Sequence, residues 1–172
     1  MRTRTLKYQK GRKNTTRSQS ADKSMSKAKY SHQKIVIMFL EMLNTVKLYH
    51  WKTSSYAQHK ATDKLYSNIN ESIDTFVEIM LGKNGGSRVN LTGTKQIPLL
   101  DYTDVTDFKK EVEKYKMFLV GMDNDSTLSL NVNTDLMNVR DEILGQLNQF
   151  TYLLTFKSVS YTHLTLPTKR IV

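Results

Sequence analysis

Four side chains of the kinds that bind metal ions recur at regular intervals between residues 55 and 82. They are His59, Asp63, Asp74 and Glu78, with spacings of 4, 11 and 4 residues. Because an α-helix turns by about 100° per residue, these spacings place all four on one strip about 100° wide. Carboxylates crowded beside an apolar stripe repel one another and lose hydration, and a cation would remove both costs. Carboxylate oxygen and imidazole nitrogen suit iron, manganese or zinc.

A fifth candidate ligand, His50, is followed by Trp51 at the expected end of the preceding helix. A short polar connection then reverses the chain, so His50 can approach the start of the next helix. The alternative is a solvated acidic face with a locally hydrogen-bonded His59, together with a helix-end histidine and a core tryptophan. Four ligand-type residues at matching intervals favour the metal site.

The other sequence motifs do not indicate a second functional site. Asp123-Asn124-Asp125 resembles the start of a calcium loop but lacks the closing Glu, so a turn is the better interpretation. Asp141 and Glu142 adjoin Arg140 without a Glu-x-x-His pattern, which favours a paired surface cluster. Cysteine is absent, which excludes disulfides and cysteine-based zinc sites and fits a reducing compartment. No Ser-His-Asp arrangement is evident, so nucleophilic hydrolysis is not expected.

Four amphipathic segments must position these side chains. Apolar residues recur every three or four positions in each, which predicts helices over 32–52, 55–82, 104–121 and 134–156. Ser54 or Ser55 can cap the second helix, and Gly82 with Gly85-Gly86 ends it. Such helices bury their stripes best against one another. The sequence therefore predicts an all-α, four-helix up-down bundle over residues 32–157, with a long loop at 83–103.

The N-terminal 31 residues form a region of different character. The chain has a net charge of +10, and residues 1–30 hold ten basic side chains and one acidic side chain. We expect this tail to be disordered, because it has no apolar periodicity. Basic side chains can displace counterions from nucleic-acid phosphates, although a solubility tail or a localisation signal would have the same composition. The candidate phosphate contacts are Arg2, Arg4, Lys7, Lys10, Arg12, Lys13 and Arg17.

The C-terminal segment breaks the helical period after about residue 157. Its core, Val159-Ser160-Tyr161-Thr162-His163-Leu164, resembles the translation of a sequencing-library adapter. Our hypothesis is that residues 158–172 are a non-native tail, the alternative being a genuine β-prone end. Such segments do not bear on the fold, and His163 is given no functional role.

The motifs around the two histidines resemble those of the Dps miniferritins, which belong to the ferritin-like superfamily. The resemblance rests on Tyr49-His50-Trp51, on His59-x3-Asp63-x-Leu65-Tyr66 and on Asp74-x3-Glu78. It implies a ferritin-like bundle and a di-iron ferroxidase site across a twofold interface. One subunit would give His50, His59 and Asp63, and its neighbour would give Asp74 and Glu78.

The resemblance also implies a homo-oligomer, either a dimer or a Dps-like shell, which oxidises and sequesters Fe(II) and binds DNA through its basic tail. Similar patterns occur in small ferritin-like proteins of phages and large DNA viruses. The alternative function is therefore a non-catalytic DNA-binding or virion-associated structural protein. No stretch of about 18 apolar residues occurs, so we expect no membrane span and a location in the cytoplasm, in the host cytoplasm or in a virion.

Overall fold

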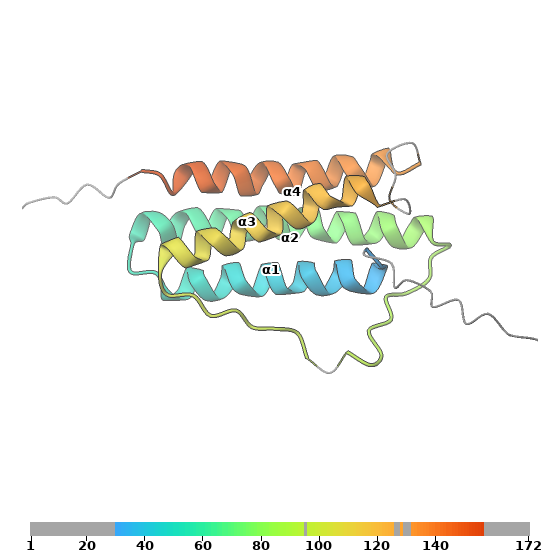
Figure 1. Cartoon of the computed structure of the whole chain (residues 1–172), viewed down its shortest axis with the longest axis horizontal. Coiled ribbons are helices and arrows are strands. Elements are labelled where there is room, and N and C mark those ends of the chain that lie inside the picture. Colours follow the sequence, from blue (N-terminus) through green and yellow to red (C-terminus); the bar gives the residue numbers. More distant parts are fainter. Residues whose placement is uncertain (1–29, 95, 126–127, 129–131, 157–172) are drawn as a thin grey trace, which may run out of the picture.

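The computed structural model describes residues 30–94, 96–125, 128 and 132–156. These residues form four long helices: α1 (His32–Lys52), α2 (Tyr56–Lys83), α3 (Val105–Gly121) and α4 (Thr134–Leu153). A short 3₁₀ helix, η1 (Met122–Asn124), continues from α3. The four α-helices lie side by side along the long axis of the molecule (Figure 1). The predicted all-α, four-helix bundle is confirmed, and none of the described helices is long and apolar enough to cross a membrane.

Short-range signals in the sequence set the helix ends. The side chain of Ser31 accepts a hydrogen bond from the backbone N–H of Lys34, and the side chain of Ser55 accepts one from Gln58. Each serine thereby satisfies one of the amides that a helix start leaves without a partner. Beyond the end of α2, Gly85 and Gly86 have φ angles of 67° and 73°, in the left-handed region that favours glycine. Gly86 donates a backbone hydrogen bond to the carbonyl of Leu81, which closes the helix.

One long loop, between α2 and α3, runs the length of the bundle. After α2, residues 84–94 and 96–104 return along the outer side of α1 to the end of the bundle where α2 began (Figure 1). Helices α2 and α3 therefore run in the same direction, whereas α1 and α2 are antiparallel across their short connection. The long crossover distinguishes this bundle from the predicted up-down arrangement, in which every pair of consecutive helices is antiparallel.

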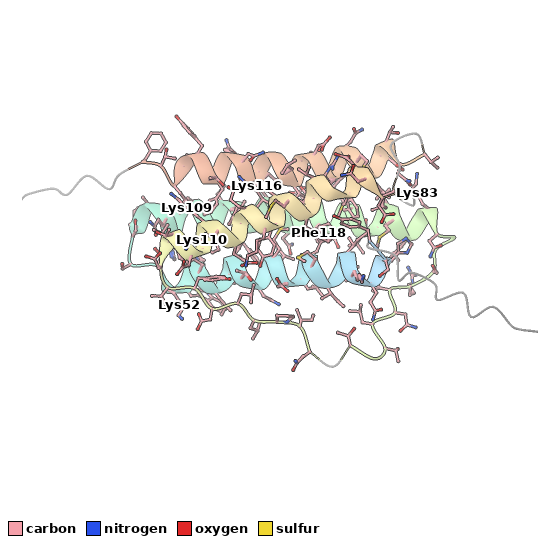
Figure 2. The ribbon with its side chains drawn as sticks, in the orientation of Figure 1. Lys52, Lys83, Lys109, Lys110, Lys116 and Phe118 are labelled. Carbon is pink, nitrogen blue, oxygen red and sulfur yellow. The ribbon has the colours of Figure 1, made fainter. Side chains whose placement is uncertain are left out.

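Three polar contacts hold the crossover loop against the bundle. Gln33 donates a hydrogen bond to the hydroxyl of Thr94 at 3.0 Å. Lys52, at the lower left of Figure 2, forms an ion pair with Asp101. The hydroxyl of Tyr102 donates a 2.7 Å hydrogen bond to the buried carboxylate of Glu111. The loop is thus fixed near its middle and near its end.

The core contains the apolar stripes of all four helices. Phe39, Phe76, Phe108 and Phe150 are almost fully buried, one from each helix. Phe108 stacks on Tyr49 with ring centroids 3.9 Å apart, which places the start of α3 against the end of α1. This contact fixes the segment that carries His50.

Arg140 is buried between α3 and α4, with an exposed fraction of 4%. Its guanidinium donates a 2.8 Å hydrogen bond to the carbonyl of Leu119 and a 2.7 Å hydrogen bond to the carboxylate of Asp123, and it lies 2.8 Å from Asp141. Asp123 and Asp141 thus pair with one arginine. The pairing of Asp141 with Arg140 agrees with the paired cluster expected from the sequence, although the arginine is buried rather than on the surface. Asp123 and Asn124 lie in the 3₁₀ helix η1 rather than in a simple turn.

The domain begins slightly earlier than the sequence pattern indicates. Tyr30 was placed in the basic tail, but its ring is buried against Phe118 and its hydroxyl donates to the carbonyl of that residue at 3.0 Å. The seven candidate phosphate contacts of the tail and the predicted non-native residues 158–172 lie outside the described residues. The fourth helix ends at Leu153 rather than 156.

Candidate metal centre

The short turn between α1 and α2 brings His50 and His59 together. Their imidazole rings stack with centroids 3.9 Å apart and planes inclined by 23°. The Nδ1 atom of His50 lies 3.0 Å from the backbone carbonyl of His59, and the Nδ1 atom of His59 lies 3.0 Å from the carbonyl of His50. Each histidine therefore binds the backbone of the other.

These reciprocal hydrogen bonds fix the tautomer of both neutral rings. A carbonyl oxygen can only accept a hydrogen bond, so each Nδ1 atom must carry a proton and donate it. In the neutral ring, the Nε2 atom then has a free lone pair. Hydrogen bonds of this type orient metal-binding histidines in proteins and fix their tautomer. The hydroxyl of Thr62, 3.3 Å from Nδ1 of His50, supports the first ring from α2.

Asp63 adds a carboxylate to the same end of the bundle. One of its oxygens lies 3.9 Å from Nε2 of His50, which is too long for a hydrogen bond. Two ligands of one ion, each about 2.1 Å from it, lie at most about 4.2 Å apart, so this distance is compatible with a shared ion. His50 is buried, whereas the Asp63 side chain is 57% exposed. An ion could thus approach from solvent and meet the imidazole nitrogens.

Asp74 and Glu78 do not join this group within one chain. They lie on the same face of α2 as Asp63, but Asp74 follows it by 11 residues, or about 16 Å along a helix. Within the described part of the chain, no three His, Asp or Glu side chains converge as a metal-binding group. The structure therefore separates the predicted ligands into two halves, one at each end of the strip.

The prediction that the carboxylates lose hydration is wrong for the single chain. Asp63, Asp74 and Glu78 are all exposed in the single chain. The strip borders the apolar stripe, as expected from the spacing, but no neighbouring element covers it. Their mutual repulsion is consequently screened by water, and one chain alone has no electrostatic need for a cation.

The two halves are related by a symmetric spacing. His59 and Glu78 lie equally far along α2 from the point between Asn68 and Ile69, and Asp63 and Asp74 are equally far from that same point. A second copy, rotated by 180° about an axis through this point, would place its Asp74 opposite Asp63 and its Glu78 opposite His59. Self-complementary patches of this kind are characteristic of twofold dimers.

A groove between α1 and α2 lies on the same outer face. Its volume is about 360 Å³, and its lining includes Val36, Leu40 and Leu43 from α1 and Ile73, Asp74 and Val77 from α2. The sequence pattern assigned Leu43, Ile73 and Val77 to the core stripes and did not predict a groove. Trp51, which the alternative interpretation placed in the core, is 67% exposed, so it is not a core residue of the single chain.

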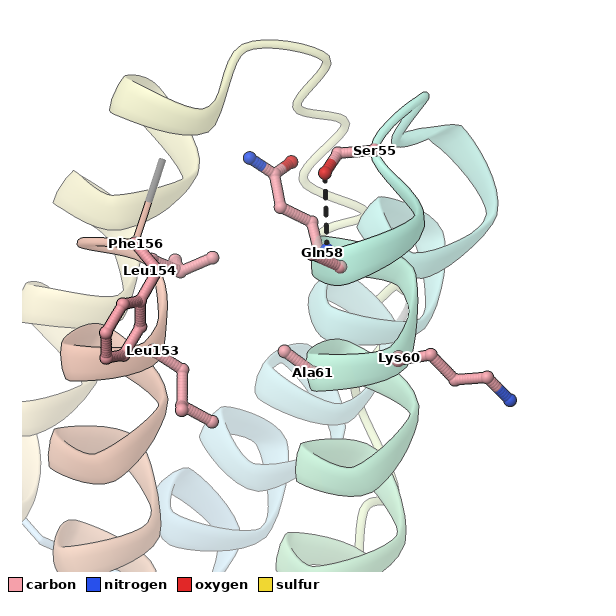
Figure 3. A pocket seen from close by; sticks show the side chains of 8 residues that line it. Ser55, Gln58, Lys60, Ala61, Leu153, Leu154 and Phe156 are labelled. Carbon is pink, nitrogen blue, oxygen red and sulfur yellow. Dashed lines mark hydrogen bonds between the residues drawn. The ribbon is translucent and has the colours of Figure 1, made fainter. Parts of the chain in front are cut away.

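A second hollow, which the sequence did not predict, lies at the end of the bundle near the start of α2. It has a volume of about 430 Å³ and contains none of the predicted ligands. Figure 3 shows the N-cap residue Ser55 and the α2 residues Gln58 and Ala61 on one side of it. On the other side lie Leu153, the last residue of α4, and Leu154 and Phe156 just beyond it. No motif marks this hollow, because its lining residues come from the ends of two helices far apart in the sequence.

Two comparisons place the chain among known proteins. A model of the family of unknown function DUF5856 matches residues 50–154, a range that includes all five candidate ligands. The chain is also 27% identical over 109 residues to an uncharacterized 14.6 kDa protein in the mobD-ri intergenic region of Enterobacteria phage T4. That alignment covers 63% of this chain and 75% of the phage protein.

The phage relative agrees with the viral kinship expected from the sequence, whereas neither comparison names a miniferritin. No solved structure matches the chain at a significant level. The family model covers more than half of the chain. The chain therefore belongs to the DUF5856 family.

Proposed function

We propose that two copies of this protein bind Fe(II) between them and oxidise it, as the Dps miniferritins do. In each of the two equivalent sites, His50, His59 and Asp63 of one copy face Asp74 and Glu78 of the other. Iron is the substrate, and each of two Fe(II) ions gives up one electron. Dioxygen takes both electrons with two protons to form hydrogen peroxide, or hydrogen peroxide takes both with two protons to form two waters. The carboxylates stabilise Fe(III) as it forms, because hard oxygen ligands favour the higher charge.

The observation that carries this proposal is the pair of reciprocal hydrogen bonds between His50 and His59. In the neutral rings they leave both Nε2 lone pairs free on stacked imidazoles, beside an exposed carboxylate. The preset tautomer of both rings reduces the ordering cost of binding a cation.

The symmetric spacing on α2 and the long crossover support the proposal independently. The spacing matches two half-sites to each other only when a second copy packs in the opposite direction. The crossover gives the helix order of ferritin-like bundles. Manganese or zinc would fit the same ligands, so the ion must be identified by measurement.

The test compares iron oxidation by the wild type with that of variants that keep the fold. His59→Asn is the sharpest change, because the asparagine amide can still donate to the carbonyl of His50 but has no atom at the Nε2 position. The double variant His59→Asn with Asp63→Asn should lose Fe(II) oxidation, followed by absorbance, and keep its helical circular dichroism. Glu142→Gln, which removes one exposed carboxylate from α4, is the matched control.

Unchanged oxidation in the double variant would refute the assignment of these residues. The mass of the protein, measured by light scattering in the same samples, should be that of a dimer or a larger assembly. A monomer that does not oxidise iron would refute the shared site.

A second function is favoured by the basic charge of residues 1–30 and by the phage relative. We propose that the tail binds nucleic acid, alone or together with the iron site. Its affinity should fall with salt by about 0.9 log units per log unit for each phosphate contacted. Deleting residues 1–29 should abolish this binding, and binding that survives the deletion would contradict it.

A further inference from the structure

The exposed Trp51 lies at one end of the outer face of α1 and α2. It is 67% exposed, an unusual state for the single tryptophan of the chain. One turn earlier on α1, the ammonium group of Lys47 lies 5.7 Å from the Trp51 ring centroid and 4.6 Å from that of Tyr66. Trp51, Lys47 and Tyr66 thus form a raised aromatic and basic cluster, with no described element over Trp51.

The groove between α1 and α2 lies toward the other end of the same face. It is lined by apolar side chains and by one carboxylate, that of Asp74. The cluster and the groove are complementary in character, since one projects an indole and a cation and the other offers an apolar hollow and an anion. They are too far apart along the bundle to meet within one chain.

The symmetric spacing of the ligands on α2 shows where this cluster would meet a second copy of the chain. His50 contacts residues 59 and 62 of α2, so the adjacent Trp51 lies at the level of that part of α2. Rotation by 180° about the point between Asn68 and Ile69 carries this level to residues 75–78, which include Val77. Lys47, one turn of α1 away, is carried to the level of Asp74. Val77 and Asp74 both line the groove.

We propose that each copy inserts its Trp51 into the α1–α2 groove of the other, where the indole packs on Val36 and Val77 while Lys47 faces Asp74. This inference rests on the twofold arrangement in the proposed function. It identifies Trp51 as the central side chain of that interface. Large aromatic side chains in central pockets dominate the energy of many protein interfaces. The contact forms twice, because the patch is self-complementary.

The test uses the full chain in the presence of a chelator, so that metal binding plays no part. The oligomeric state is measured by light scattering over a dilution series, and the fluorescence of the single tryptophan is followed in the same samples. Association should shift the Trp51 emission to shorter wavelength and reduce its quenching by acrylamide. Val77→Lys, which puts a charge in the groove, should give a folded monomer with the emission of exposed tryptophan.

Thr75→Lys is the matched control, because it adds the same charge to an exposed position on a different face of α2. It should associate as the wild type does. A chain that stays monomeric at all concentrations, or a dimer in which Trp51 remains as exposed as in the monomer, would overturn the proposal. A dimer that buries Trp51 but binds no iron would refute the proposed function alone, and an iron-binding dimer with exposed Trp51 would refute this inference alone.

Discussion

Replacing Arg140 by methionine should destabilise the bundle by about 2–4 kcal/mol. The guanidinium is buried and donates to the carbonyl of Leu119 at 2.8 Å and to the carboxylate of Asp123 at 2.7 Å. Hydrogen bonds to charged groups contribute roughly 1.5–3 kcal/mol each. Methionine restores part of the packing. In the variant, the Leu119 carbonyl still accepts a hydrogen bond from the backbone N–H of Met122. The loss of stability should therefore be smaller than the sum of the two arginine hydrogen bonds.

The free energy of unfolding should be measured by urea titration with far-UV circular dichroism. A loss of this size is a large part of the about 5–15 kcal/mol that stabilises a typical domain. Arg88→Met makes the same chemical change at an exposed position on the crossover loop and should change the stability by no more than about 0.5 kcal/mol. A loss below about 1 kcal/mol for Arg140→Met would show that the buried arginine does not hold α3 against α4.

Two further substitutions test the contacts around the crossover loop. Burial raises the pKa of Glu41, and the nearby Glu111 carboxylate raises it further. The folded state therefore disfavours the charged form. This destabilisation is present above the pKa of Glu41 in the folded state and absent below its pKa in the unfolded state. Glu41→Gln should therefore be more stable than the wild type at neutral pH. It should lose that advantage as the pH falls through the ordinary glutamate range. Urea unfolding at several pH values would show this, and a constant difference would contradict it. The hydrogen bond to Glu111 raises the pKa of Tyr102 to about 12, so Tyr102 stays protonated and donating at neutral pH. Tyr102→Phe should cost about 1 kcal/mol and speed hydrogen exchange in residues 96–104, whereas unchanged exchange would show that the contact does not hold the loop.

Local patterns were enough to predict the helices. The apolar periodicity located all four to within three residues at each end, and the Ser55 cap and the paired glycines of α2 act where they were expected. The approach of His50 to the start of α2 also followed from the sequence, because a short turn leaves little freedom in how the chain reverses.

The remaining features depend on contacts distant in the sequence. The burial of Tyr30 requires Phe118, which lies 88 residues later. The path of residues 84–94 and 96–104 along α1 depends on Lys52, Gln33 and Glu111, and no local signal specifies those partners. The exposure of the carboxylates could not be predicted from periodicity, because a helical strip at the edge of the core is covered only if another element or another chain packs on it.

The central claim, a metal site shared by two copies, is tested most directly by mixing two inactive variants. One variant carries His59→Asn and Asp63→Asn, and the other carries Asp74→Asn and Glu78→Gln. Neither should oxidise Fe(II) alone. After unfolding and refolding together in equal amounts, about half of the dimers should be mixed, each with one intact site, so about a quarter of the wild-type oxidation should return. A mixture that stays as inactive as its parts, although the chains have exchanged, would contradict the shared site.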